Sequence, residues 1–242
     1  QAAADAEPEP YKRRKRILPL DGIPFPHYED FLLDRYPGDE LIVEWSRGCI
    51  GACSFCKGKM IDGKYRTHSA EAILASLKHY VEFLHIDRFT VCDPVLNGDV
   101  EEMAKLCQLI IDSGLKLQWR GEAIPHKEQT AEVLQAMRAA GCYELQLGVE
   151  SASTKVLKLM NKLRLFDPDT AASVVRAAHE AGIRTALFTI IGFPGEDEEA
   201  FMDTYNFVRE NADYIDELKS INALHIITDT PMMKSPIGML DP

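Results

Sequence analysis

Three helical segments of this 242-residue chain end in the same way, and this repetition constrains the fold more than any other feature. Each ends at a glycine that an apolar residue follows: Ser113-Gly114-Leu115, Ala140-Gly141-Cys142 and Ala181-Gly182-Ile183. A glycine directly after a helix takes the left-handed conformation that closes the helix. The chain therefore repeats a strand–loop–helix–glycine unit, which predicts parallel strands joined by helical crossovers.

The repeat begins at Leu41, and the apolar patterns predict six strands, at 41–46, 88–92, 115–119, 144–149, 183–191 and 219–227. Helices are predicted from the N-caps Ser69 and Asp99 and at 130–140, 152–160, 168–181 and 197–209. Six strands are too few for a closed eightfold barrel. The predicted fold class is α/β, a partial (βα)6 TIM-like barrel with a parallel, curved, six-stranded sheet. A flat, doubly wound sheet is the alternative.

The first forty residues differ in composition from the rest. Residues 1–16 combine Ala, Glu and Pro with a basic run and predict a disordered linker or tail. Residues 17–40 carry Pro19, Pro24 and Pro26 among aromatic residues, which excludes a regular helix and predicts an extended strap against the core. The core domain is assigned to residues 41–242.

The charge and cysteine content exclude several classes of protein. The net charge of −11 gives no support for nucleic-acid binding. No apolar run approaches the roughly 18–20 residues that span a bilayer, so no membrane association is expected. Six cysteines, three of them clustered, do not form a secreted disulfide framework. We expect a cytoplasmic protein.

Cys49, Cys53 and Cys56 follow the first predicted strand with the spacing Cys-x-x-x-Cys-x-x-Cys. Thiolates this close can converge on an iron–sulfur cluster, zinc or copper(I). Structural zinc takes four protein ligands, and a fully ligated cubane cluster takes four cysteines. Three cysteines on a cubane leave one iron open to another ligand. Two alternatives belong to other classes of protein. One is a binding module with a structural zinc site that His68 completes, and the other is an electron-transfer protein that carries the cluster.

The carboxyl ends of parallel strands are where such folds gather their chemistry. The predicted strand ends hold several polar residues besides the cysteines: Asp93, Asn97, Arg120, Glu122, His126, Glu150, Ser151 and Glu196. Asp93 could accept an ammonium group, or it could be a turn residue before Pro94. Glu150 could hold a ribose diol, or Glu150 and Ser151 could begin a helix. Phe55, between two cysteines, is placed to lie against a planar base.

The motif SRGCIGACSFC, with its Cys-x-x-x-Cys-x-aromatic-Cys spacing, resembles the radical S-adenosylmethionine (radical SAM) superfamily. The resemblance extends over about residues 41–231 and includes the stretches LGVES and IIGFPGE. It implies that Cys49, Cys53 and Cys56 bind a 4Fe-4S cluster. It also implies S-adenosylmethionine contacts from Phe55, Asp93, Glu150, Ser151, Ile191 and Gly192. Asp93 stands where many members carry Gly-Gly-Glu.

The resemblance also implies a mechanism. One electron, from a donor such as flavodoxin or ferredoxin, would cleave S-adenosylmethionine reductively and give a 5′-deoxyadenosyl radical that abstracts a hydrogen from the substrate. The substrate, a small molecule or a peptide, is not identified. Its candidate contacts are Arg120, Glu122, His126 and His225. Modification of RNA is an alternative that the acidic composition disfavours.

The stretch LPLDGIPFPHYEDF resembles the segment that leads into the radical domain of cobalamin-binding members. It implies a cobalamin-dependent methyltransferase or a related enzyme. Cobalamin itself would be bound by a domain outside these 242 residues, and the linker-like first residues fit a junction with it. Cys92, Cys107 and Cys142 lie on apolar faces and are predicted to be core residues rather than ligands of a second cluster.

Overall fold

The computed structural model describes residues 17–36, 38–61 and 63–234, and its centre is a six-stranded parallel sheet. The strand order is β1-β4-β5-β6-β7-β8, and each neighbouring pair is parallel. The strands are β1 (Leu41–Val43), β4 (Arg88–Val91), β5 (Gln118–Ala123), β6 (Cys142–Glu150), β7 (Arg184–Ile191) and β8 (Glu217–Ala223). The sheet is not closed, because β1 and β8 remain its two edges. The predicted partial barrel is thus confirmed.

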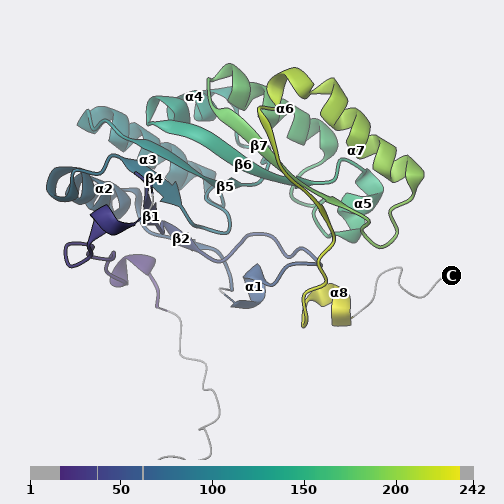
Figure 1. Cartoon of the computed structure of the whole chain (residues 1–242), viewed down its shortest axis with the longest axis horizontal. Helices are drawn as coiled ribbons and strands as arrows, with labels where there is room; N and C mark the ends of the chain where they lie inside the picture. The colour runs from purple at the N-terminus through teal and green to yellow at the C-terminus, as the bar shows by residue number, and fades with distance from the viewer. Residues whose placement is uncertain (1–16, 37, 62, 235–242) are drawn as a thin grey trace, which may run out of the picture.

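The long helices cover the convex side of the curved sheet and leave the other side open (Figure 1). They are α2 (Ala70–Leu84), α3 (Val100–Ser113), α4 (Ala131–Ala139), α6 (Pro168–Glu180) and α7 (Glu198–Glu210). Each begins at a side chain that accepts a hydrogen bond from a backbone N–H of its first turn. The shorter helical elements are η1 (Leu20–Gly22), η2 (Leu33–Arg35), α1 (Gly58–Ile61), α5 (Thr154–Leu159), η3 (Ala212–Tyr214) and α8 (Pro231–Lys234).

The hydrophobic core lies between the sheet and these helices. Trp45 and Trp119 meet edge to face at 5.2 Å, and the Trp119 indole N–H donates to the Ala140 carbonyl at 3.0 Å. The glycine that ends the α4 turn is required there, because a Cβ on Gly141 would lie 2.1 Å from the Leu117 carbonyl oxygen. All three glycines of the repeat have a positive φ, of +68°, +98° and +80°, and this left-handed conformation explains why the repeat uses glycine.

Three of the predicted strands differ from the structure by about three or more residues at a boundary, and the other three by fewer. The third strand begins at Gln118 rather than 115 and continues to Ala123, and the last ends at Ala223. The first strand stops at Val43, after which β2 (Ser46–Arg47) pairs antiparallel with β3 (Arg66–Thr67). The chain leaves the sheet there because the Asp93 carboxylate accepts from Trp45 N and Ser46 Oγ.

Within the predicted strap, 17–40, residues 17–36 pack along α2 without a regular helix beyond two short turns. The Tyr80 hydroxyl of α2 donates to the Pro26 carbonyl at 3.0 Å, and the Tyr28 hydroxyl donates to the Ile42 carbonyl at 2.8 Å. The strap thus connects α2 with the edge strand β1. The predicted tail, 1–16, lies outside the described residues. Among the described residues, no helix combines the length and the apolar character that crossing a membrane requires.

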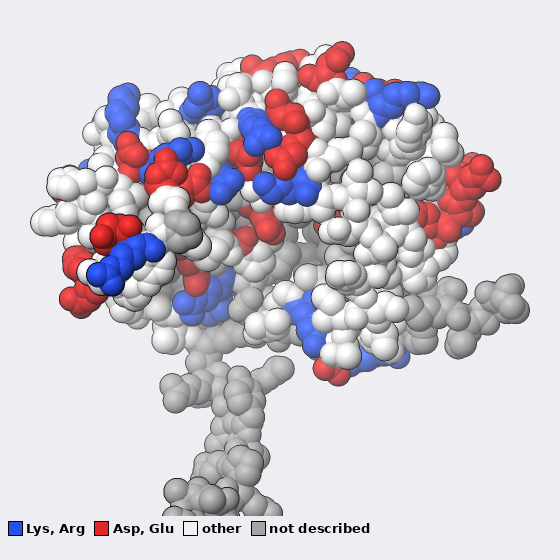
Figure 2. Space-filling model, in the orientation of Figure 1, with Lys and Arg blue, Asp and Glu red and all other residues white. Residues whose placement is uncertain are grey.

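A row of alternating charges, which we call the floor, crosses the concave face near the amino ends of the strands. Side chains at paired positions of a sheet point to the same side, and Arg120 pairs with Glu144, which pairs with Arg184. Glu144 is buried, with Arg184 at 2.8 Å and Arg120 at 3.6 Å. The floor consists of Asp39, Glu40, Arg88, Arg120, Glu144, Arg184 and Glu217. On the face in Figure 2, basic and acidic residues are interspersed, while acidic residues gather over α7.

Candidate functional site

The cysteine loop lies between β2 and α1, beyond the carboxyl end of β1. Backbone N–H groups point at two of its sulfurs: Gly51 N to Cys49 Sγ and Gly58 N to Cys56 Sγ, each at 3.2 Å. Such donors stabilise thiolates and tune iron–sulfur clusters. They indicate a loop arranged around sulfur ligands.

The residues after α5 anchor this loop. Ser54 donates from its backbone to the Met160 carbonyl at 2.9 Å and from its hydroxyl to the Leu159 carbonyl at 3.1 Å. The Asn161 amide donates to the Ala52 carbonyl at 2.8 Å. The loop is therefore positioned by a segment more than a hundred residues away in sequence.

The donor set fits a cubane cluster better than a single metal ion. A Cβ on Gly51 would lie 3.3 Å from Cys49 Sγ and 3.5 Å from Cys53 Sγ, so this glycine leaves a space that two sulfurs face. A tetrahedral zinc ion would hold its sulfurs about 3.8 Å apart. The three cysteine sulfurs are not all within 4.8 Å of one another. Ligands on separate irons of one cube are spread more widely.

His68 does not join the cysteines. Its ring is buried against Phe25 at a centroid distance of 4.2 Å, and its Nδ1 lies 3.3 Å from Asp21 Oδ1 of the strap. The alternative of a zinc site that His68 completes therefore lacks its geometry.

A cavity of about 290 Å³ opens beside the loop at the carboxyl ends of β5–β8. We call its chemically capable lining the mouth: Phe55, Glu122, Glu150 and His225. Its volume is near the lower end of the roughly 300–1,000 Å³ of small-molecule pockets. Phe55 meets Phe193 edge to face at 6.2 Å, so its ring is packed at the wall of the cavity, and its predicted contact with a planar base stays a prediction.

Glu150 is held in place by a residue that sequence analysis missed. Lys162 is 3% exposed, and its Nζ donates to the Gly148 carbonyl at 2.7 Å and to Glu150 Oε1 at 3.3 Å. Glu150 has a φ of +67°, at a bulge that ends β6. In the sequence, Lys162 follows Lys158 and precedes Arg164, so nothing marks it as the buried cation of the three.

Charges converge at the mouth. Burial raises the pKa of the Cys53 thiol to about 11, and the charge of Lys162 opposes that shift. Burial, and then the charge of Glu150, raise the pKa of Glu122. Glu122 is solvent-exposed and lies in the lining of the cavity. Lys162 thus pairs with Glu150 and its charge also acts on a cysteine of the loop, whereas Glu122 is affected by burial and by the charge of Glu150.

Asp93 is placed differently. It is 2% exposed, Oδ1 accepts from Trp45 N at 2.9 Å, and Oδ2 accepts from Ser46 Oγ at 2.7 Å. Burial raises its pKa to about 7, although these two hydrogen bonds lower it. Asp93 fixes the segment that enters the cysteine loop, and its contact with the methionine amine stays a prediction.

Ser151 faces α7 rather than the cavity. Its hydroxyl lies 3.0 Å from Thr204 Oγ1 and accepts from Ser153 N at 3.1 Å. Ile191 and Gly192 follow one another where β7 ends, next to Ile190, which lines the cavity, and Gly192 has a φ of +76°. The cofactor contacts predicted for these residues stay predictions.

Of the four predicted substrate contacts, the structure brings two to the mouth, Glu122 and His225. Arg120 belongs to the floor, where it contacts Glu40 at 2.7 Å. His126 is bound locally, with its Nδ1 accepting from Glu128 N at 3.2 Å.

The predicted burial of the remaining cysteines is correct for two of the three. Cys107 and Cys142 are fully buried, but Cys92 is exposed. Strand alternation explains this error, because Val91 and Asp93 turn toward the core and Cys92 therefore turns away from it.

Comparison with known proteins places this geometry in a family. The profile of the Radical SAM superfamily matches residues 43–208. The chain belongs to the radical SAM superfamily. Radical SAM membership identifies it as part of an enzyme and implies a 4Fe-4S cluster and S-adenosylmethionine, and the cysteine loop and mouth fit those groups.

The radical SAM relatives are mostly longer proteins. An uncharacterized methyltransferase of Pyrococcus horikoshii is 30% identical over 209 residues, which are 81% of this chain and 43% of the relative. The methyltransferase TsrM of Kitasatospora setae, solved with cobalamin and a [4Fe-4S] cluster, superimposes with a TM-score of 0.69 at 19% identity, over 80% of this chain and 36% of TsrM. The cobalamin-dependent enzyme OxsB gives a TM-score of 0.66 at 18% identity, over 81% and 34%. This chain spans less than half of each.

Proposed function

We propose that this domain binds a 4Fe-4S cluster through Cys49, Cys53 and Cys56 and cleaves S-adenosylmethionine reductively as part of a cobalamin-dependent methyltransferase. The observation that carries the proposal is the position of the cysteine loop beside a cavity whose carboxylate, Glu150, is fixed by the buried Lys162. The bound cluster would supply the electron that breaks a carbon–sulfur bond of S-adenosylmethionine.

Each residue of the mouth has a defined part in this proposal. Glu150 accepts hydrogen bonds from the ribose hydroxyls, and Lys162 holds its carboxylate in position. Phe55 offers a flat apolar surface to the adenine ring. Three cysteines leave one iron free for the amino-acid end of the cofactor. Together these groups would orient S-adenosylmethionine and exclude water from it.

Methyl transfer with cobalamin is supported by similarity. The relative from Pyrococcus horikoshii is named a methyltransferase, and both solved relatives are cobalamin-dependent or contain cobalamin. Glu122 and His225 are the residues that we propose to contact the substrate.

The electron would come from an acidic donor such as flavodoxin or ferredoxin. A hollow of about 640 Å³ behind the cysteine loop is lined by Ala52, Lys155 and Lys158. Asn161, which also lines this hollow, donates to the Ala52 carbonyl of the cysteine loop. The chain as a whole has a net charge of −11. Lys155 pairs with Asp197 at 2.6 Å, so Lys158 is the lysine of this hollow that we propose to face an acidic partner.

The proposal is tested with the anaerobically reconstituted chain. Iron and labile sulfide are measured first, and then the protein is incubated with dithionite and S-adenosylmethionine. We expect about four irons per chain and release of 5′-deoxyadenosine and methionine. An intact cluster without cleavage would support simple electron transfer, and stoichiometric zinc without iron would support a zinc module. Methylation is tested separately in the complete protein supplied with methylcobalamin.

A further inference from the structure

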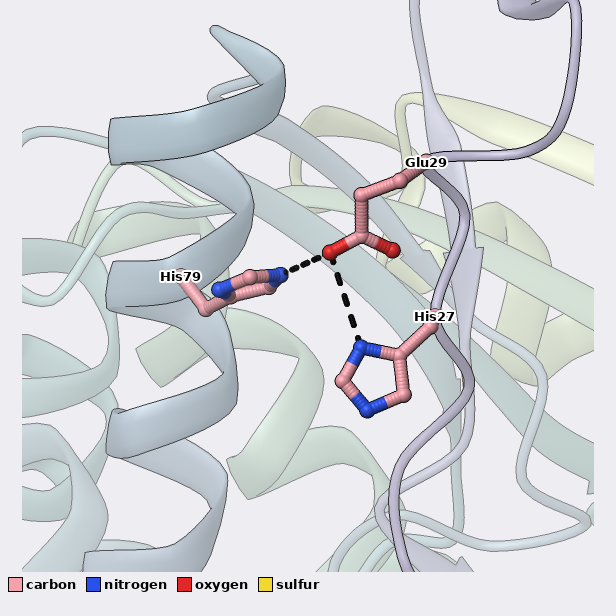
Figure 3. Close-up of side chains that lie close together, drawn as sticks. All are labelled: His27, Glu29 and His79. Carbon is pink, nitrogen blue, oxygen red and sulfur yellow. Dashed lines mark hydrogen bonds and ion pairs between the residues drawn. The ribbon is translucent and has the colours of Figure 1, made fainter.

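Two histidines and a glutamate from separate segments meet on the surface where the strap crosses α2 (Figure 3). His27 and Glu29 belong to the strap, and His79 lies on α2. His79 Nε2 is 2.5 Å from Glu29 Oε1, and His27 Nδ1 is 3.5 Å from the same oxygen. Among the described residues, no other three His, Cys, Asp or Glu side chains bring ligand atoms within 4.8 Å of one another.

The spacing of these atoms suits one metal ion. Zinc bound at about 2.0–2.1 Å in a tetrahedron holds its ligand atoms about 3.3 Å apart. The His27–Glu29 separation of 3.5 Å is close to this value, and the His79–Glu29 separation of 2.5 Å requires a small side-chain shift. Two imidazoles and a carboxylate form a recognised ligand set for zinc with a water as fourth ligand.

The surroundings favour a ligand site over a simple hydrogen-bonded cluster. The His79 ring is oriented by Phe83 at 4.9 Å and Tyr80 at 5.9 Å, so its Nε2 is directed at Glu29. The pKa of Glu29 is lowered by a hydrogen bond from the backbone N–H of Glu29 itself and by one from the His79 ring, which keeps the carboxylate ionised. The three side chains are 77%, 41% and 31% exposed for His27, Glu29 and His79, so water can complete the coordination.

We propose that His27, Glu29 and His79 form a binding site for a divalent zinc-type ion, separate from the cysteine loop, that fastens the strap to α2. The bound ion would join residues fifty positions apart in sequence. The strap leads into β1, after which the chain enters the cysteine loop. A fixed strap therefore orders the approach to that loop without taking part in its chemistry.

The test uses protein whose cysteines already carry the reconstituted cluster, so that zinc does not report on them. Zinc binding is measured by equilibrium dialysis, with zinc and iron determined in the same samples. We expect one zinc per chain with iron unchanged. His27→Ala and His79→Ala should each weaken zinc binding at least about tenfold, or ~1.4 kcal/mol.

Two further variants separate the site from general surface binding. Glu29→Gln keeps a side chain that can hydrogen-bond both rings but removes the charged ligand, and it should also weaken binding. His85→Asn removes an exposed histidine just after α2 and should leave binding unchanged. Hydrogen exchange in residues 23–33 should slow with zinc in the wild-type protein and not in His79→Ala. Equal zinc affinity in wild type and His79→Ala, or an equal loss in His85→Asn, would show adventitious binding only and overturn the proposal.

Discussion

The floor and the mouth, at opposite ends of the concave face, differ in whether their carboxylates are paired with cations. At the floor, carboxylates alternate with arginines, and the buried Glu144 lies between two of them. At the mouth, Glu122 and Glu150 lie in one cavity, where Lys162 contacts Glu150 and no described cation pairs with Glu122. The floor satisfies its own charges, whereas the mouth leaves acceptors for a ligand.

Whether a charged residue has a partner in the protein distinguishes structural from functional residues better than the type of residue does. Arg120 and Glu122 are two positions apart on β5, and both looked like substrate contacts in the sequence. Arg120 is occupied by floor partners, but Glu122 is not. Unpaired carboxylates in a partly enclosed site cost free energy, and such sites are typically functional.

Removal of one cysteine at the mouth should have the largest effect. Cys53→Ala should lose the cluster and all cleavage of S-adenosylmethionine, because no described side chain can replace the third ligand. Iron content and 5′-deoxyadenosine formation measure this. The control is the buried Cys107→Ala, which should keep both and lose about 1 kcal/mol or more of unfolding free energy. Loss of iron from that control would contradict the ligand assignment.

Substitution of Lys162 tests the support of the mouth. Lys162→Met keeps the length of the side chain but removes the hydrogen bond to Glu150, which is worth about 1.5–3 kcal/mol for a charged group. Affinity for S-adenosylmethionine, measured by calorimetry on the reconstituted protein, should fall about ten- to hundredfold. The exposed Lys158→Met on α5 is the matched control and should bind normally. Unchanged affinity in both variants would remove Lys162 from the site.

Substitution of Glu144 tests the floor. Glu144→Ala leaves Arg120 and Arg184 without their shared carboxylate, and we expect a loss of about 3 kcal/mol, the lower end for broken buried pairs, because both arginines keep access to water. Urea unfolding measures the loss, with the exposed Glu82→Ala as control. Affinity for S-adenosylmethionine should not change. A fall in affinity without a fall in stability would mean that floor and mouth are not independent.

Asp93 follows β4 at the same end of the sheet as the mouth, but its carboxylate oxygens already have hydrogen-bond partners, as those of the floor do. The pH dependence of stability tests how this buried carboxyl group titrates. Its folded pKa of about 7 exceeds the ordinary 3.8, so folding binds a proton between these values. The free energy of unfolding should therefore fall as pH rises from about 4 to 7, by up to ~1.4 kcal/mol per pH unit from this group. Asp93→Asn should flatten that slope in urea unfolding at pH 4.5–8. Identical slopes would show that Asp93 does not titrate in this range.

The sequence predicted the elements well because helix caps and glycine ends are local signals. Ser69, Asp99 and Gly141 act where they were expected to act. The start of β5 was placed three residues early because Leu115 and Leu117 are apolar, although the ladder begins at Gln118. Apolar runs do not reveal where hydrogen bonding to a neighbour starts.

The candidate site was predictable where its residues are adjacent in sequence and not where they meet only in space. The cysteine loop and Glu150 stand in recognisable stretches. Lys162 reaches Glu150 from beyond the far end of helix α5, and Ser151 turns toward Thr204 of α7. The cluster of His27, Glu29 and His79 depends on the strap crossing α2, which no spacing encodes.

The backbone at Glu150 has a consequence for engineering. Any residue other than glycine at a φ of +67° loses about 1–2 kcal/mol of conformational free energy. Glycine would remove this strain but would also remove the carboxylate. It would leave the buried Lys162 without its partner, and breaking a buried pair costs about 3–5 kcal/mol, more than the strain that is relieved, so both stability and the proposed cofactor binding favour a carboxylate at position 150. Stabilised forms meant to stay active should be selected with this position fixed.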